Sequence, residues 1–173
     1  MTEEQRRIRG YLQGQAAKLS PAEIVDKVRT AMAQLREAAA GVPPARFAER
    51  PGPEEWSANE VLAHVVEAGR HFGGAIARIL EGRAAEALPD EAAGDTSPRR
   101  LEQWWTLLER DRATLFEHVL RAEAGRRLEA TVEHPMFGPL NWRETLLFMR
   151  LHDLDHAGQL QKIAGAFALS SPA

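Results

Sequence analysis

Four segments of the chain begin with a helix-capping signal and continue with apolar residues at helical spacing. Their start signals are, in chain order, Ser20-Pro21, Ser57 with Glu60, Ser97-Pro98, and Asn141 with Glu144. We expect helices over about residues 20–40, 57–80, 97–125 and 141–165. Because each carries an apolar stripe and no convincing series of strands intervenes, the pattern predicts an all-α four-helix bundle.

The segments outside these four helices predict less regular structure within a single domain of 173 residues. Residues 1–19 form an N-terminal extension, in which 3–17 predict a short extra helix interrupted by glycines. A long crossover is expected over 81–96, and the connection over 126–140 has room for a short extended piece. Residues 166–173 are expected to be a polar tail.

Composition and charge exclude several classes of function. The chain has no cysteine, so any metal site must use nitrogen and oxygen ligands, and disulfides are excluded. A net charge of −3 with interspersed signs gives no reason to expect a nucleic-acid partner. No apolar run reaches the ~18 residues of a membrane helix, and the N-terminus does not resemble a secretory signal. We therefore expect a cytoplasmic protein with no membrane partner.

Two histidines on the fourth predicted helix form a candidate metal site. His152 and His156 are four residues apart, so their rings lie about 40° apart on one face, one turn from each other. Phe148 and Leu160 lie on the same face, which places both rings inside the apolar stripe. Buried imidazoles need polar partners. A shared metal ion is one such partner, and ordinary hydrogen bonds in the core are the alternative.

A third histidine lies on the second predicted helix. His64 is at the border of that helix's apolar stripe, where a facing helix could bring it to the pair. Three nitrogen ligands and a water would form an open, catalytic type of site. His71 is two turns further on, about 10 Å away along the axis, so we expect a pocket or surface residue. His118 and His134 have no supporting pattern and are expected to be solvated.

Three segments resemble motifs of one protein family. Residues 56–64 (WSANEVLAH) resemble the second-helix entry of the DinB-like superfamily, and residues 152–160 (HDLDHAGQL) resemble its fourth-helix motif. Residues 134–141 (HPMFGPLN) resemble the turn before that helix, and the likeness spans about residues 20–165. The resemblance implies up-down-down-up helix order and a homodimer.

The same resemblance implies a metal, commonly nickel or zinc, at His64, His152 and His156. Some relatives are transferases or isomerases that use a low-molecular-weight thiol such as mycothiol or bacillithiol. Nothing in this sequence marks a site for such a thiol. The resemblance therefore implies the fold and the metal more directly than it implies a reaction.

Five polar residues near these motifs leave alternatives open. Asp155 could orient an imidazole or act as a base, and Gln159 could bind substrate or a metal-bound water. Asp153 is expected to be a solvated carboxylate. Glu60 caps a helix and could also support a metal ligand, while Arg112 could bind an anionic substrate, snorkel, or pair with an acid at a subunit interface.

These features support two classes of function and one metal-free alternative. An open three-histidine site activates water or a thiol and polarises a carbonyl, as in a hydrolase or a thiol-dependent transferase that acts on a small-molecule substrate. A non-catalytic dimer that binds a metal or a small ligand is the second class. The fourth coordination position discriminates between them, because closure by Gln159 or a carboxylate would favour binding alone. In the third reading, the histidines bind no metal.

Overall fold

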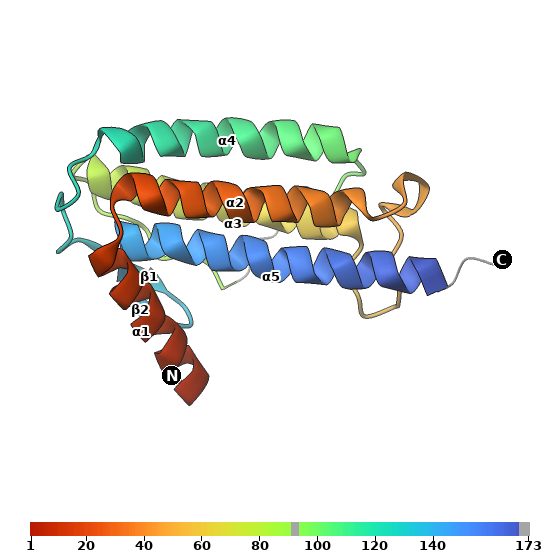
Figure 1. Cartoon of the computed structure of the whole chain (residues 1–173), viewed down its shortest axis with the longest axis horizontal. Coiled ribbons are helices and arrows are strands. Elements are labelled where there is room, and N and C mark those ends of the chain that lie inside the picture. The colour runs from red at the N-terminus through yellow and green to blue at the C-terminus, as the bar shows by residue number, and fades with distance from the viewer. Residues whose placement is uncertain (91–93, 170–173) are drawn as a thin grey trace.

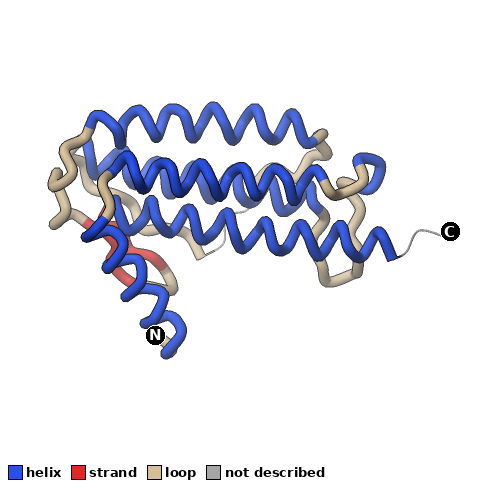
Figure 2. The backbone as a smooth tube through the Cα atoms, viewed as in Figure 1, coloured by secondary structure: helices blue, strands red, loops and turns tan. Residues whose placement is uncertain are grey.

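The computed structural model describes residues 1–90 and 94–169, and most of these residues are helical. The elements are α1 (Glu3–Lys18), α2 (Pro21–Ala40), the 3₁₀ turn η1 (Pro44–Arg46), α3 (Ala58–Leu80), α4 (Leu101–Arg121), β1 (Thr131–His134), β2 (Gly138–Asn141) and α5 (Trp142–Leu169). Figure 2 shows how small a part of the backbone the two strands form. Among the described residues, no helix has the length and apolar character that crossing a bilayer requires.

Helices α2 to α5 form the predicted four-helix bundle. Figure 1 shows α2 and α5 running from left to right, whereas α3 and α4 run from right to left, which confirms the up-down-down-up order. Helix α5 packs against both α2 and α3, and α4 closes the other side of the bundle against α2 and α3. The apolar stripes of all four helices meet in one continuous core. Helices α3 and α5, which carry the three candidate ligands, are therefore direct neighbours.

Local capping sets the start of three bundle helices where the sequence predicts it. The Ser57 hydroxyl accepts a hydrogen bond from the backbone N–H of Glu60 at 3.2 Å, and the Glu60 carboxylate accepts one from the N–H of Ser57 at 2.8 Å. The same reciprocal arrangement joins Ser20 to Glu23 and Asn141 to Glu144. Each of these caps satisfies backbone donors that a helix N-terminus leaves without an intrahelical partner.

The third bundle helix begins later than predicted. Ser97 does not cap it, because the Ser97 hydroxyl and backbone N–H both bind the Asp95 carboxylate, at 2.6 and 3.0 Å. The next residues are held in extended form by a buried side chain of α3, since the backbone N–H of Arg99 donates to Asn59 Oδ1 at 3.0 Å. Helix α4 therefore starts at Leu101, and it ends at Arg121, before the predicted end.

The N-terminal helix and the hairpin lie together at one end of the bundle (Figure 1). Helix α1 is continuous through both of its glycines and packs against α5 with Leu12 and Ala16 buried. Strands β1 and β2 pair antiparallel, with His134 opposite Gly138, and they supply the extended piece expected within 126–140. Part of the expected tail, residues 166–169, instead continues α5, and residues 170–173 lie outside the described residues.

Candidate metal centre

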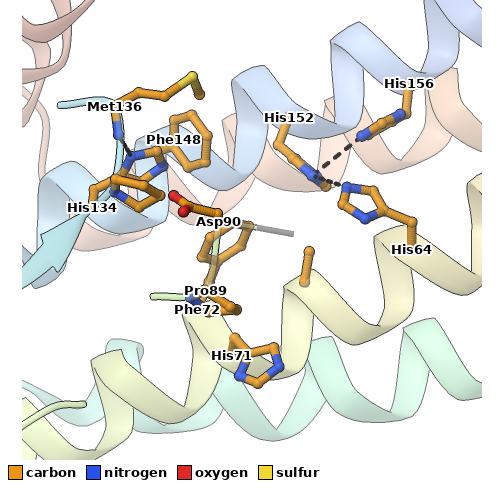
Figure 3. Close-up of a pocket in the computed structure, with 12 residues that line it drawn as sticks. His64, His71, Phe72, Pro89, Asp90, His134, Met136, Phe148, His152 and His156 are labelled. Carbon is orange, nitrogen blue, oxygen red and sulfur yellow. Dashed lines mark hydrogen bonds between the residues drawn. The ribbon is translucent and has the colours of Figure 1, made fainter. Parts of the chain in front are cut away.

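Helices α3 and α5 bring the three predicted histidines to one point (Figure 3). The Nε2 atom of His152 lies 3.0 Å from Nε2 of His64 and 3.2 Å from Nε2 of His156. One ligand nitrogen from each ring lies within 4.8 Å of the others. Nitrogens that share a tetrahedral zinc ion at about 2.0–2.1 Å lie about 3.3 Å apart, and both separations from His152 are close to that value.

The chemistry of the three rings also fits a metal ion. A proton on Nε2 of His152 can lie toward only one of the two neighbouring rings at a time. A divalent cation instead accepts the lone pairs of all three nitrogens. Within residues 1–90 and 94–169, no second group of three histidine or acidic side chains is placed to share an ion.

Burial favours the neutral, metal-binding form of His152 and His156. It lowers the pKa of His152 well below the ordinary histidine value, and the neighbouring His156 and His64 lower that pKa further. Burial also lowers the pKa of His156, although a hydrogen bond to Gln159 opposes the shift. Because only the neutral imidazole offers a lone pair, these two rings are ready to bind a cation at neutral pH.

The hydrogen bond to Gln159 also determines which nitrogen of His156 faces the cluster. Nδ1 of His156 lies 2.9 Å from Oε1 of Gln159. The amide oxygen can only accept, so Nδ1 carries the ring proton and Nε2 keeps its lone pair. Asp155, by contrast, is exposed, and among the described residues its carboxylate makes no hydrogen bond to a ligand ring. Catalytic roles for Asp155 and Gln159 remain predictions.

The interpretation of Asp153 as a solvated carboxylate is wrong. Asp153 is 0% exposed, and it accepts a 2.8 Å hydrogen bond from Nη2 of Arg112, which is 3% exposed. This ion pair joins α4 to α5 inside the bundle, so Arg112 pairs within its own chain and not at a subunit interface. Burial raises the pKa of Asp153, and Arg112 opposes the rise.

Three further predicted residues have clear positions. His134 is 5% exposed, so the expectation that it is solvated is wrong. His71 is half-exposed, its Nε2 lies 3.5 Å from Oε1 of Glu67, and it lines the first pocket apart from the three ligand rings (Figure 3). Glu60 caps α3 and also accepts a 3.0 Å hydrogen bond from Nε of Arg50, which uses the carboxylate in support of the fold.

Two pockets adjoin the histidine cluster. The first has a volume of about 190 Å³ and lies between α3, α5, the hairpin turn and residues 89–90 of the crossover. Phe72 and Phe148 form its apolar walls, with ring centroids 5.3 Å apart. The second, of about 430 Å³, lies beside Trp56, Gln159 and Lys162. All three histidines line the first pocket, and His156 also lines the second.

Comparisons with known proteins agree with this fold. The sequence model described as the DinB superfamily matches residues 9–160, which include all three histidines. The match begins inside α1, earlier than the likeness seen in the motifs alone. The solved structure titled "Crystal structure of TT2238, a four-helix bundle protein" has a TM-score of 0.63 and 24% identity, covering 83% of this chain and 99% of that one. A comparison with curated proteins finds no match.

Proposed function

Since the chain belongs to the DinB superfamily, we propose that it binds one nickel or zinc ion through His64, His152 and His156 and acts as a metal-dependent enzyme on a small molecule. The observation that carries the proposal is the convergence of three Nε2 atoms beside a pocket. Three protein nitrogens leave a fourth coordination position for water or substrate, which is the arrangement of catalytic zinc sites.

The surroundings of the cluster favour an enzyme over a binding module. Gln159 could close the fourth position, but its amide oxygen already accepts from Nδ1 of His156. Asp155, which precedes His156 in the helix, is exposed, and no hydrogen bond to a described residue directs it to the cluster. Neither side chain therefore closes the fourth position, and the pocket walled by Phe72 and Phe148, which all three histidines line, would give a substrate access to a bound ion.

Two reaction types suit such a site. A bound divalent ion lowers the pKa of a coordinated water or thiol and polarises a carbonyl, so we propose hydrolysis or transfer of a low-molecular-weight thiol. The two pockets that meet at His156 offer separate positions for a substrate and a co-substrate. The homodimer and the cytoplasmic location are proposals that rest on the family likeness and on the sequence.

Elemental analysis of protein purified without a histidine tag tests the metal site. We expect close to one equivalent of divalent transition metal per chain after incubation with nickel or zinc. His64→Ala, His152→Ala and His156→Ala should each lower the affinity sharply in a calorimetric titration, because each removes one of three ligands.

His118→Ala is the matched control for these variants. His118 is exposed on α4, outside the cluster, so its loss should leave the affinity unchanged. His71→Ala should also change it little, because that ring contacts Glu67. Protein that takes up neither nickel nor zinc, or a His64 variant with wild-type affinity, would refute the proposed site.

A further inference from the structure

The hairpin turn fixes the tautomer of His134. The backbone N–H of Met136 donates a hydrogen bond to Nδ1 of His134 at 3.1 Å (Figure 3). Nδ1 must therefore carry a lone pair, and in the neutral ring the proton is on Nε2. Burial lowers the pKa of His134 to about 4, so the ring is neutral at physiological pH. His134 is thus a hydrogen-bond donor of fixed orientation.

This donor faces the pocket that leads to the histidine cluster. The His134 ring packs against Phe148 and Phe137, with centroids 4.4 and 4.8 Å apart, and it lines the same pocket as His152. Among the described residues, no protein group accepts a hydrogen bond from its Nε2. Nε2 is not among the fully buried polar atoms, and His134 lines the pocket, so a ligand oxygen there could accept this hydrogen bond.

The size and walls of the pocket limit what can bind there. A cavity of about 150 Å³ is large enough for benzene, so a pocket of about 190 Å³ has room for a six-membered ring with a small substituent. Phe72, Phe148 and Met136 offer ring faces and a thioether to such a group. The carboxylate of Asp90 also lines the pocket and disfavours an anionic oxygen near it.

We propose that His134 is a specificity-determining residue whose Nε2–H binds the neutral carbonyl oxygen of a small cyclic or aromatic ligand in this pocket. The inference rests on the proposed metal-dependent function, because it treats that ligand as the substrate class of the metal site. The aromatic walls bind the ring, and the His134 donor selects a carbonyl compound over an analogue that lacks the oxygen.

Binding of two isosteric probes tests this inference. Acetophenone carries a carbonyl oxygen where α-methylstyrene carries a CH₂ group, so the pair differs in the hydrogen-bond acceptor. We expect zinc-loaded protein to bind acetophenone about fivefold more tightly in a ligand-observed NMR titration. The preference should persist in metal-free protein, because the donor belongs to the protein.

Two variants of His134 separate the donor from the fold. His134→Asn keeps an acceptor where Nδ1 receives the Met136 N–H but has no donor at the position of Nε2, so the preference should vanish. His134→Gln places an amide N–H near that position and should restore part of it. Circular dichroism and zinc content are measured for each sample.

Three results would overturn the inference. One is equal binding of both probes to the wild type. Another is an unchanged preference in His134→Asn, which would place the oxygen on the metal or elsewhere. The third is an imidazole ¹⁵N spectrum that shows the proton on Nδ1. Failure to bind zinc would instead refute the proposed metal site, and the metal-free titration would still decide the role of His134.

Discussion

Replacing Arg112 with methionine tests the consequence of leaving one charge unpaired at the centre of the bundle. Arg112 and Asp153 are 3% and 0% exposed, and one hydrogen bond of 2.8 Å joins them. Nη1 of Arg112 and Oδ2 of Asp153 make no hydrogen bond to any residue that the structure describes. The pair therefore carries the full cost of desolvation while using only part of its bonding capacity.

The expected magnitude follows from that environment. Methionine nearly conserves the volume of arginine, so the cavity contribution is small, and the main cost is a buried carboxylate without its cation. Removing one partner of a buried pair costs about 3–5 kcal/mol, which we expect for Arg112→Met. Replacing both partners removes both charges, so Arg112→Met/Asp153→Leu should lie within about 2 kcal/mol of the wild type or exceed its stability.

Urea unfolding at pH 7 measures the free energies of unfolding, and the double-mutant cycle gives the coupling. The deficit of Arg112→Met should also shrink as the pH is lowered. Without Arg112 the pKa of Asp153 rises further above its unfolded value, so the native state binds more protons and the penalty grows with pH. Additive single effects, or a cost below about 1 kcal/mol for Arg112→Met, would refute this account of the pair.

Two other perturbations follow from single contacts. Gln159→Leu removes the acceptor that orients His156 and should weaken zinc binding by about 10–100-fold in calorimetry, whereas an unchanged affinity would show that the contact does not position the ligand. A hydrogen bond from Arg50, aided by Ser57, lowers the pKa of Glu60 to about 2, so Glu60→Gln should cost about 1–2 kcal/mol at pH 6. That cost should decline below pH 4.5, because the unfolded chain takes up a proton at Glu60 there while the native carboxylate stays ionised down to about pH 2. Thermal unfolding that shows a constant difference down to pH 2.5 would contradict it.

Features set by local interactions could be predicted from the sequence. The capping boxes at Ser20 and Ser57 join residues three apart, so they form wherever the helix begins. The relation between His152 and His156 is likewise a property of one helix. The position of His64 beside this pair depends on the packing of α3 against α5. The family motifs implied that packing, and the apolar stripes of the two helices are consistent with it.

Features that depend on distant partners were missed. From its place between His152 and His156 in the sequence, Asp153 is predicted to be solvated. Its partner Arg112 is 41 residues away on another helix, so local sequence does not reveal the ion pair. The available signal was Arg112 itself, because an arginine inside an apolar stripe needs a buried acid as its partner. For His134 the signal was the alternation of side chains along a strand. Val132 and His134 are two residues apart, so a strand that buries Val132 also directs His134 to the core.

The arrangement of the site explains how three polar rings can lie inside an apolar bundle. His152 and His156 differ by one turn of α5, so their separation is fixed by helix geometry, and packing against α3 sets the distance to His64. The hydrogen bond from Nδ1 of His156 to Gln159 leaves Nε2 of His156 free of its proton and directed to the cluster. The hydrogen bond from Met136 to Nδ1 of His134 leaves the proton of His134 on Nε2, which is directed to the pocket. Because these constraints come from the backbone and the core, the site can hold its geometry before any ion or substrate binds.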